Sequence, residues 1–144
     1  MSWNTFKSIY KAEMAKPNGD PAKGLSDGYH AAIINSVSNT TGPAFGNKTL
    51  MFAQLKLCFN SFGIIPFSRG LDLSLISYWL GAKTALGAVS FFPGLTGIFL
   101  ESKGKEAKDV DEFLDLCILA FNVHLKQVAF AQGTLFNYGY TVLS

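Results

Sequence analysis

The sequence predicts a mainly α-helical protein: a single-domain bundle of about five helices with Gly/Pro-rich loops and an extended C-terminal tail. Five segments carry apolar residues at spacings of three and four, the helical period, and Gly- and Pro-rich stretches separate them. No linker or internal repeat divides the 144 residues, a length typical of one domain. We therefore assign residues 1–133 to a helical domain and residues 134–144 to an apolar extended tail.

The first two predicted helices are separated by Pro17-Asn18-Gly19. The first begins at its expected cap, Asn4. The second begins at Asp20-Pro21, because Asp caps a helix and Pro lacks only an N–H that the first turn does not use. Gly24 and Gly28 either weaken the second helix, by roughly 1 kcal/mol each relative to Ala, or permit close contact with another helix. The apolar stripes are Trp3, Phe6, Tyr10 and Met14 in the first helix and Ala22, Leu25, Tyr29, Ile33 and Val37 in the second.

The third helix is predicted over residues 47–63 and the fourth over residues 72–86, with a connector at residues 64–70. In the third helix apolar residues also lie outside the main face, which predicts burial on more than one side. The main apolar faces are Met51, Leu55, Cys58, Phe59 and Phe62 in the third helix and Leu75, Trp79, Ala82 and Leu86 in the fourth.

The clearest helical pattern follows Asp109. Glu112 stands three residues after this capping residue, a capping-box variant that also places acidic side chains at the positive end of the helix dipole. We expect Gly133 to end the helix. Its apolar stripe is Val110, Leu114, Cys117, Phe121, Val128 and Ala131, with His124 at the expected position between Phe121 and Val128.

The tail is uncharged and rich in residues that favour extended structure. Such a segment either covers the core of its own chain or pairs with an exposed edge of a neighbour, and the residues leave both readings open. Because the other apolar segments are expected in the core, the tail is the predicted partner interface. The candidate interface residues are Leu135, Phe136, Tyr138, Tyr140, Val142 and Leu143.

Charged residues are scarce and phenylalanine is abundant. Asp, Glu, Lys and Arg make up 15% of the chain, against about 25% in a typical protein, and 13 residues are Phe. So few charged side chains cover a free monomer poorly, which predicts that apolar surface contacts a partner. The net charge of +2, without a basic run, argues against nucleic-acid binding, which requires a basic face.

The sequence predicts no catalytic, metal or cofactor site and no enzymatic activity. A metal site needs several His, Cys or acidic residues to converge, and the two Cys and two His show no close ligand spacing. Cys58 and Cys117 are expected as buried free thiols, and His30 and His124 as packed or surface side chains. Cys117 and His124 lie two helical turns apart, on the order of 10 Å, too far for direct proton transfer.

Gly46-Asn47-Lys48-Thr49 comes closest to a phosphate-binding motif. It is similar to the end of a P-loop, in which backbone N–H groups hold phosphate and Lys reaches it. However, Asn47 interrupts the Gly-Lys pair, and no pattern typical of a parallel strand precedes it. Nucleotide binding is therefore a minor alternative.

Residues 71–100 are the most apolar part of the chain, with only Asp72 and Lys83 charged. The segment exceeds the roughly 20 residues of a membrane-spanning helix. Phe91-Phe92-Pro93-Gly94 nevertheless indicates a turn, so we expect a buried core hairpin. A membrane-associated or membrane-active, holin-like protein built on this segment is the alternative.

Five short segments spread along the chain carry a resemblance: Trp3-Asn4-Thr5-Phe6, Tyr29-His30-Ala31-Ala32-Ile33, Gly46-Asn47, Tyr78-Trp79-Leu80-Gly81-Ala82, and His124-Leu125 with Gly133 downstream. Together they resemble small, uncharacterised virion structural proteins of contractile-tailed bacteriophages. The resemblance implies a non-enzymatic tail, baseplate or neck component of a virion, assembled in the host cytoplasm. Its implied partners are other virion proteins or further copies of the chain, and no catalytic residues come with it. The low charge and abundant aromatic residues agree with such obligate contacts.

Overall fold

The computed structural model describes residues 3–34, 46–80, 83–84, 87–90, 107–125, 129–132 and 135–138. Five helices and four short strands lie within these segments, so the chain is mainly α-helical and the predicted fold class is confirmed. The helices are α1 (Asn4–Met14), α2 (Pro21–Ile34), α3 (Lys48–Phe59), α4 (Phe67–Trp79) and α6 (Val110–Leu125). The strands are β1 (Lys83–Thr84), β2 (Gly87–Ser90), β3 (Ala129–Gln132) and β4 (Leu135–Tyr138).

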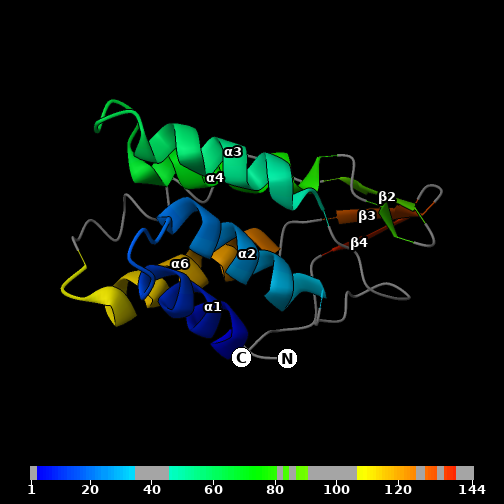
Figure 1. The fold of residues 1–144 in the computed structure, drawn as a ribbon. Helices are drawn as coiled ribbons and strands as arrows, with labels where there is room; N and C mark the ends of the chain where they lie inside the picture. Colours follow the sequence, from blue (N-terminus) through cyan, green and yellow to red (C-terminus); the bar gives the residue numbers. More distant parts are fainter. Residues whose placement is uncertain are drawn as a thin grey trace.

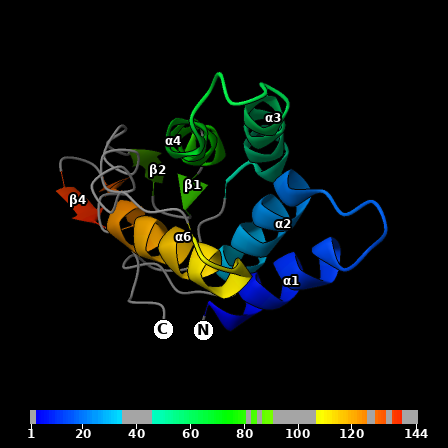
Figure 2. The ribbon, with the colours of Figure 1, turned by 90° about the vertical axis from the view of Figure 1, so that its left-hand side faces the viewer.

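The helices form two layers. The α3–α4 hairpin lies on one side and α1, α2 and α6 lie on the other (Figure 1), and the view turned by 90° shows the same division (Figure 2). The strands lie at the end of the bundle where α4 and α6 finish. The opposite end holds the α1–α2 turn, the α3–α4 turn and the start of α6.

Three helices start with side-chain caps, of which those at Asp20 and Asp109 were predicted, while Asn47 was predicted only as a helix start. The side chains of Asp20, Asn47 and Asp109 accept hydrogen bonds of 3.0, 3.0 and 2.8 Å from backbone N–H groups two or three residues later. The predicted cap at Asn4 is wrong by one residue. Trp3 occupies the cap position of α1 and makes no capping hydrogen bond with its side chain, because the indole has only an N–H donor and cannot accept from a backbone N–H. Its ring is buried in the core.

An aromatic cluster joins the two layers. The ring centroid of Tyr29 lies 4.8 Å from that of Phe121 and 5.0 Å from that of Tyr78, so α2, α4 and α6 meet at this side chain. Close approach of α1 to α2 depends on Gly28, since a Cβ there would lie 2.9 Å from the carbonyl oxygen of Phe6. The glycines of α2 therefore permit helix contact, the second of the two predicted readings.

Helices α3 and α4 differ from their predicted bounds. Helix α3 ends at Phe59 rather than near residue 63, so Phe62 leaves the predicted apolar face. Helix α4 begins at Phe67, within the predicted connector, because Pro66 fixes the extended backbone of the cap position. Helix α4 ends at Trp79 rather than at residue 86, because the backbone of the next residue, Leu80, is extended.

The predicted end of the last helix at Gly133 is also wrong, because α6 ends at Leu125. Residues 129–132 fit the helical period but form β3, whose backbone pairs antiparallel with β2 and β4. The sheet order is β1-β2-β3-β4, so β4, the first part of the predicted tail, is a terminal strand. Val37 and the tail residues Tyr140, Val142 and Leu143 lie outside the described residues.

Candidate interaction site

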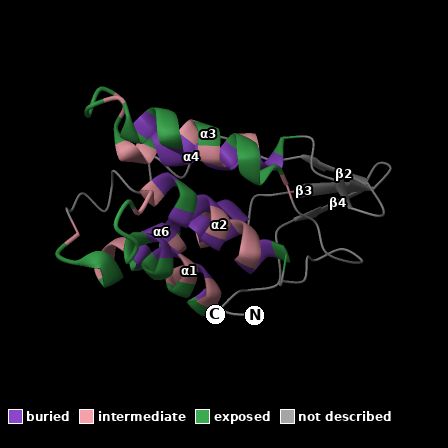
Figure 3. Ribbon diagram, viewed as in Figure 1, coloured by how far each residue is buried: buried purple, intermediate pink, exposed green. Residues whose placement is uncertain are grey.

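Exposed apolar side chains are concentrated on the α3–α4 hairpin. Seven of the eleven large apolar side chains that are exposed in the described segments lie between residues 50 and 80. Figure 3 shows the corresponding exposed face of α3 on the outside of the bundle. The seven are Leu50, Leu57, Phe59, Phe62, Ile64, Leu73 and Leu80.

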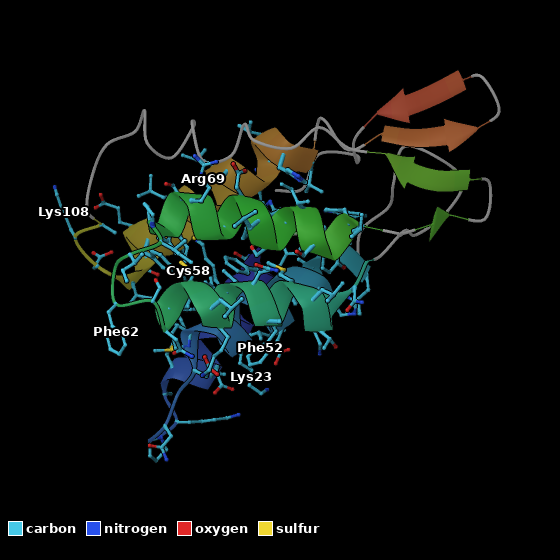
Figure 4. The ribbon with its side chains drawn as sticks, turned by 90° about the horizontal axis from the view of Figure 1, so that it is seen from above. Lys23, Phe52, Cys58, Phe62, Arg69 and Lys108 are labelled. Atoms are coloured by element: carbon cyan, nitrogen blue, oxygen red, sulfur yellow. The ribbon has the colours of Figure 1, made fainter. Side chains whose placement is uncertain are left out.

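The α3–α4 turn presents two of these side chains to solvent almost completely. Phe62 is 96% exposed and Ile64 is 83% exposed. Ser61, which lies between the end of α3 and these two side chains, fixes the turn. Its hydroxyl donates a hydrogen bond of 2.6 Å to the carbonyl oxygen of Cys58 and accepts one of 3.2 Å from the N–H of Ile65. In Figure 4 the labelled ring of Phe62 points away from the bundle.

Phe62 also has an unusual backbone conformation. Its φ is +55°, in the left-handed region, and Gly63 follows with φ +83°. A side chain with a Cβ costs about 1–2 kcal/mol in that region, whereas Gly adopts it freely. The turn therefore holds an exposed aromatic residue where folding alone favours glycine, and strain of this kind concentrates at functional sites.

An aromatic row connects this turn to the core. The ring centroids of Phe59 and Phe67 lie 5.8 Å apart, those of Phe67 and Phe113 lie 5.4 Å apart, and Tyr10 continues the row at 5.9 Å from Phe113. We call the surface formed by Phe59, Phe62, Ile64, Phe67 and Phe113 the apolar end. The labelled side chains of Arg69 and Lys108 lie toward the same end of the molecule (Figure 4).

A cavity of about 260 Å³, open to solvent at the surface, lies between α2 and α3, lined by Lys23, Asp27, Lys48, Thr49 and Phe52. Asp27 bridges the two lysines: its carboxylate oxygens lie 2.8 Å from Nζ of Lys23 and 3.2 Å from Nζ of Lys48. Partial burial by itself would raise the pKa of Asp27, but the hydrogen bonds from the lysines outweigh it and lower the pKa.

His30 lies beside this cavity and contacts the core. Its Nδ1 is 2.8 Å from the hydroxyl oxygen of Tyr78. Burial lowers the pKa of His30, the charge of Lys48 lowers it further, and Asp27 opposes both effects. His30 and Lys48 therefore belong to one local electrostatic environment, which the sequence spacing of 18 residues did not indicate.

The other residues considered for chemistry are enclosed in the core. Cys58 and Cys117 are buried and free, as predicted. Burial raises the pKa of Cys117 and lowers the pKa of His124 to about 4. Over the part of the chain that the structure describes, no group of three or more His, Cys, Asp or Glu residues could hold a metal ion.

Residues 71–100 are described in part, as most of α4 together with β1 and β2. Within α4, Leu71 and Leu75 are buried against the core. None of the described helices is both long and apolar enough to span a bilayer.

Comparison with known proteins finds no matching family model, no similar curated protein and no similar solved structure. The apolar end and the cavity are therefore interpreted from their own geometry. Sequence patterns missed the first site. For the second they indicated only Lys48 and Thr49, as part of the Gly46-Asn47-Lys48-Thr49 motif, and not Lys23, Asp27 or Phe52. The signal for the first is the stretch of residues 57–68, which has no charge and contains Phe62-Gly63.

Proposed function

We propose that this chain is a non-enzymatic structural subunit of a larger assembly and that it contacts a neighbouring protein through the apolar end. The observation that carries the proposal is the outward-pointing Phe62, held at positive φ beside the exposed Ile64. Burial of one large apolar side chain contributes about 1.5–3 kcal/mol, and aromatic anchors dominate protein interfaces. A neighbour that covers the turn gains this contribution, which the isolated chain lacks.

We further propose that the assembly is a phage virion, with this chain as a tail, baseplate or neck component assembled in the host cytoplasm. Other virion proteins, further copies of the chain, or both are the partners. This part of the proposal rests on the sequence segments that resemble virion structural proteins. The apolar end supports the need for a neighbour.

The C-terminal segment is a second proposed contact. Leu135, Phe136 and Tyr138 belong to β4, a terminal strand of the sheet. Among the strands that the structure describes, β4 pairs with β3 alone, and a strand from a neighbour can pair with the other row of its backbone groups. This proposal also includes the predicted interface residues Tyr140, Val142 and Leu143.

Sedimentation velocity tests the role of the apolar end. We expect the full chain to sediment with concentration dependence, and a Phe62→Ser/Ile64→Ser double variant to lose it. Leu80→Ser is the matched control, since Leu80 is also exposed but lies at the other end of α4. A wild-type chain that stays monomeric at every concentration and binds no component of the particle would contradict the proposal.

The proposed location has its own test. Mass spectrometry of purified virions should detect the chain at a fixed copy number relative to the other structural proteins. Its absence from particles that contain the remaining structural proteins would refute the virion assignment. Partitioning of the expressed chain between soluble and detergent-extracted fractions separates the proposal from the membrane-associated alternative at residues 71–100.

A further inference from the structure

The α2–α3 cavity has an excess of positive charge. The ammonium groups of Lys23 and Lys48 share the single carboxylate of Asp27, and Glu13 lies farther away, 3.7 Å from Lys23. The lysine side chains are 51% and 44% exposed, so each ammonium can turn toward a ligand without unfolding the helix that carries it. An anion entering the cavity therefore meets two cations and competes with Asp27 for both of them and with Glu13 for Lys23.

The cavity wall on α3 is held in place before any ligand arrives. The backbone N–H of Asn47 donates a hydrogen bond of 2.7 Å to the carbonyl oxygen of Tyr78, which ties the start of α3 to the end of α4. Gly46 packs against the same carbonyl group so closely that a Cβ would overlap it. Lys48 and Thr49 follow at once, so their positions are fixed by the fold, and preorganisation of this kind favours binding.

The remaining wall is aromatic. Phe52 lies one helical turn after Lys48 and lines the same cavity, which Figure 4 shows with Lys23 and Phe52 on the same side of the bundle. Ligand sites combine an apolar surface with a few polar groups that orient the ligand. The volume of about 260 Å³ lies near the lower limit of such sites, about 300 Å³, and accommodates one ring with one anionic group.

We propose that this cavity binds a small organic anion in which a phosphate or carboxylate group is attached to a flat aromatic body. Lys23 and Lys48 bind the anionic group, the hydroxyl of Thr49 donates a hydrogen bond to it, and the ring packs on Phe52. The proposal is independent of the assembly function, because the apolar end contributes no residue to this cavity.

Titration of the full chain followed by ¹H–¹⁵N NMR tests the proposal, with phenyl phosphate and benzoate as probes. At least one probe should shift the amide signals of Lys48, Thr49 and Phe52 until binding saturates. The probe with the lower dissociation constant identifies the preferred anionic group. Phenol and inorganic phosphate are the controls, and each should bind at least fivefold more weakly. Equal binding of phenol would remove the role of the lysines, equal binding of inorganic phosphate would remove the role of the ring, and either result overturns the proposal.

Three variants separate ligand binding from a structural role. Lys48→Met should weaken the preferred probe at least fivefold, with Lys23→Met as an independent second variant. Asp27→Asn should tighten binding, because it removes the competing carboxylate; a purely structural ion pair predicts no such gain. Lys56→Met is the matched control, since Lys56 forms a similar pair with Asp20 at 2.9 Å outside the cavity. If Lys48→Met and Lys56→Met bind the probe equally, the assignment fails.

Discussion

The indole N–H of Trp79 donates a hydrogen bond of 2.9 Å to the hydroxyl oxygen of Tyr29, and both side chains are completely buried. The bond joins α4 in one layer to α2 in the other. Buried polar groups of this kind contribute modestly when paired and destabilise strongly when a partner is removed. The hydrogen bond between Trp79 and Tyr29 therefore fixes the alignment of the two helical layers and also strengthens their packing.

Replacement of Tyr29 by Phe should lower the free energy of unfolding by about 1–3 kcal/mol, because the buried indole N–H loses this acceptor. Urea denaturation at neutral pH measures the change. Tyr78→Phe is a second test of a buried hydroxyl: it removes the contact with Nδ1 of His30 and a hydrogen bond with the backbone of Gly46, so a loss of similar size is expected. A Tyr29→Phe variant as stable as the wild type would contradict the assigned role.

Acidification should destabilise the chain through His124. Burial lowers the pKa of His124 in the folded chain to about 4, below its ordinary value near 6.5, so the unfolded chain binds the proton more readily. The contribution of the neutral His124 side chain to the free energy of unfolding is then fully present above pH 6.5. It decreases as the pH falls, by about 2 kcal/mol between pH 7 and pH 4.5. The lowered pKa of His30 acts in the same direction.

Urea denaturation at a series of pH values measures this dependence, and the range above pH 4.5 avoids most carboxylate titration. His124→Phe should flatten the profile, whereas His30→Asn should leave most of it. If the slope survives in His124→Phe, the buried imidazole is not its source.

Gly28→Ala should destabilise the protein, although Ala normally stabilises an exposed helix interior by about 1 kcal/mol relative to Gly. The added Cβ would lie 2.9 Å from the backbone oxygen of Phe6, which cannot move without shifting α1. We expect a net loss of about 1–3 kcal/mol, in the range of overpacked cores. Gly24→Ala is the matched comparison, because its nearest neighbour, at 3.0 Å, is the ring of Tyr10 and can rotate away. If thermal denaturation gives Gly24→Ala a lower melting temperature than Gly28→Ala, this expectation is wrong.

Phe62→Gly should make the isolated chain more stable and its association weaker. Glycine relieves the left-handed backbone strain, with an expected gain of about 0.5–1 kcal/mol after the greater flexibility of the unfolded chain is included. Asn60→Gly tests the interpretation, since Asn60 has an ordinary φ of −86° and should gain nothing. Denaturation and sedimentation velocity on the same samples give both quantities. Loss of stability in Phe62→Gly would show that the ring supports the fold instead.

Local chemistry made three of the five helix starts predictable. Asp20, Asn47 and Asp109 cap helices through bonds to residues that follow directly in the sequence. The end of α6 was not predictable in this way, because residues 129–132 fit a helical period and became a strand only through pairing with β2 and β4. Tertiary pairing overrides local preference in such segments.

The two sites depend on tertiary structure in the same manner. Phe62 is apolar like the buried residues of α3, and the turn held by the Ser61 hydroxyl leaves it facing solvent. Likewise, Lys23 and Lys48 come together because α2 and α3 pack with Asp27 between the two lysines. Sequence patterns predict which residues prefer burial, whereas packing decides which of them remain uncovered.

The contact between Trp3 and Asn122 has a consequence for the order in which the fold forms. The indole N–H of Trp3 donates a hydrogen bond of 3.0 Å to the side chain of Asn122, across 119 residues of sequence. The α1–α2 and α3–α4 hairpins close over short loops, and such local contacts form early. During synthesis Trp3 emerges from the ribosome 119 residues before Asn122, so the residue that precedes the first helix reaches its final environment only after α6 has been made.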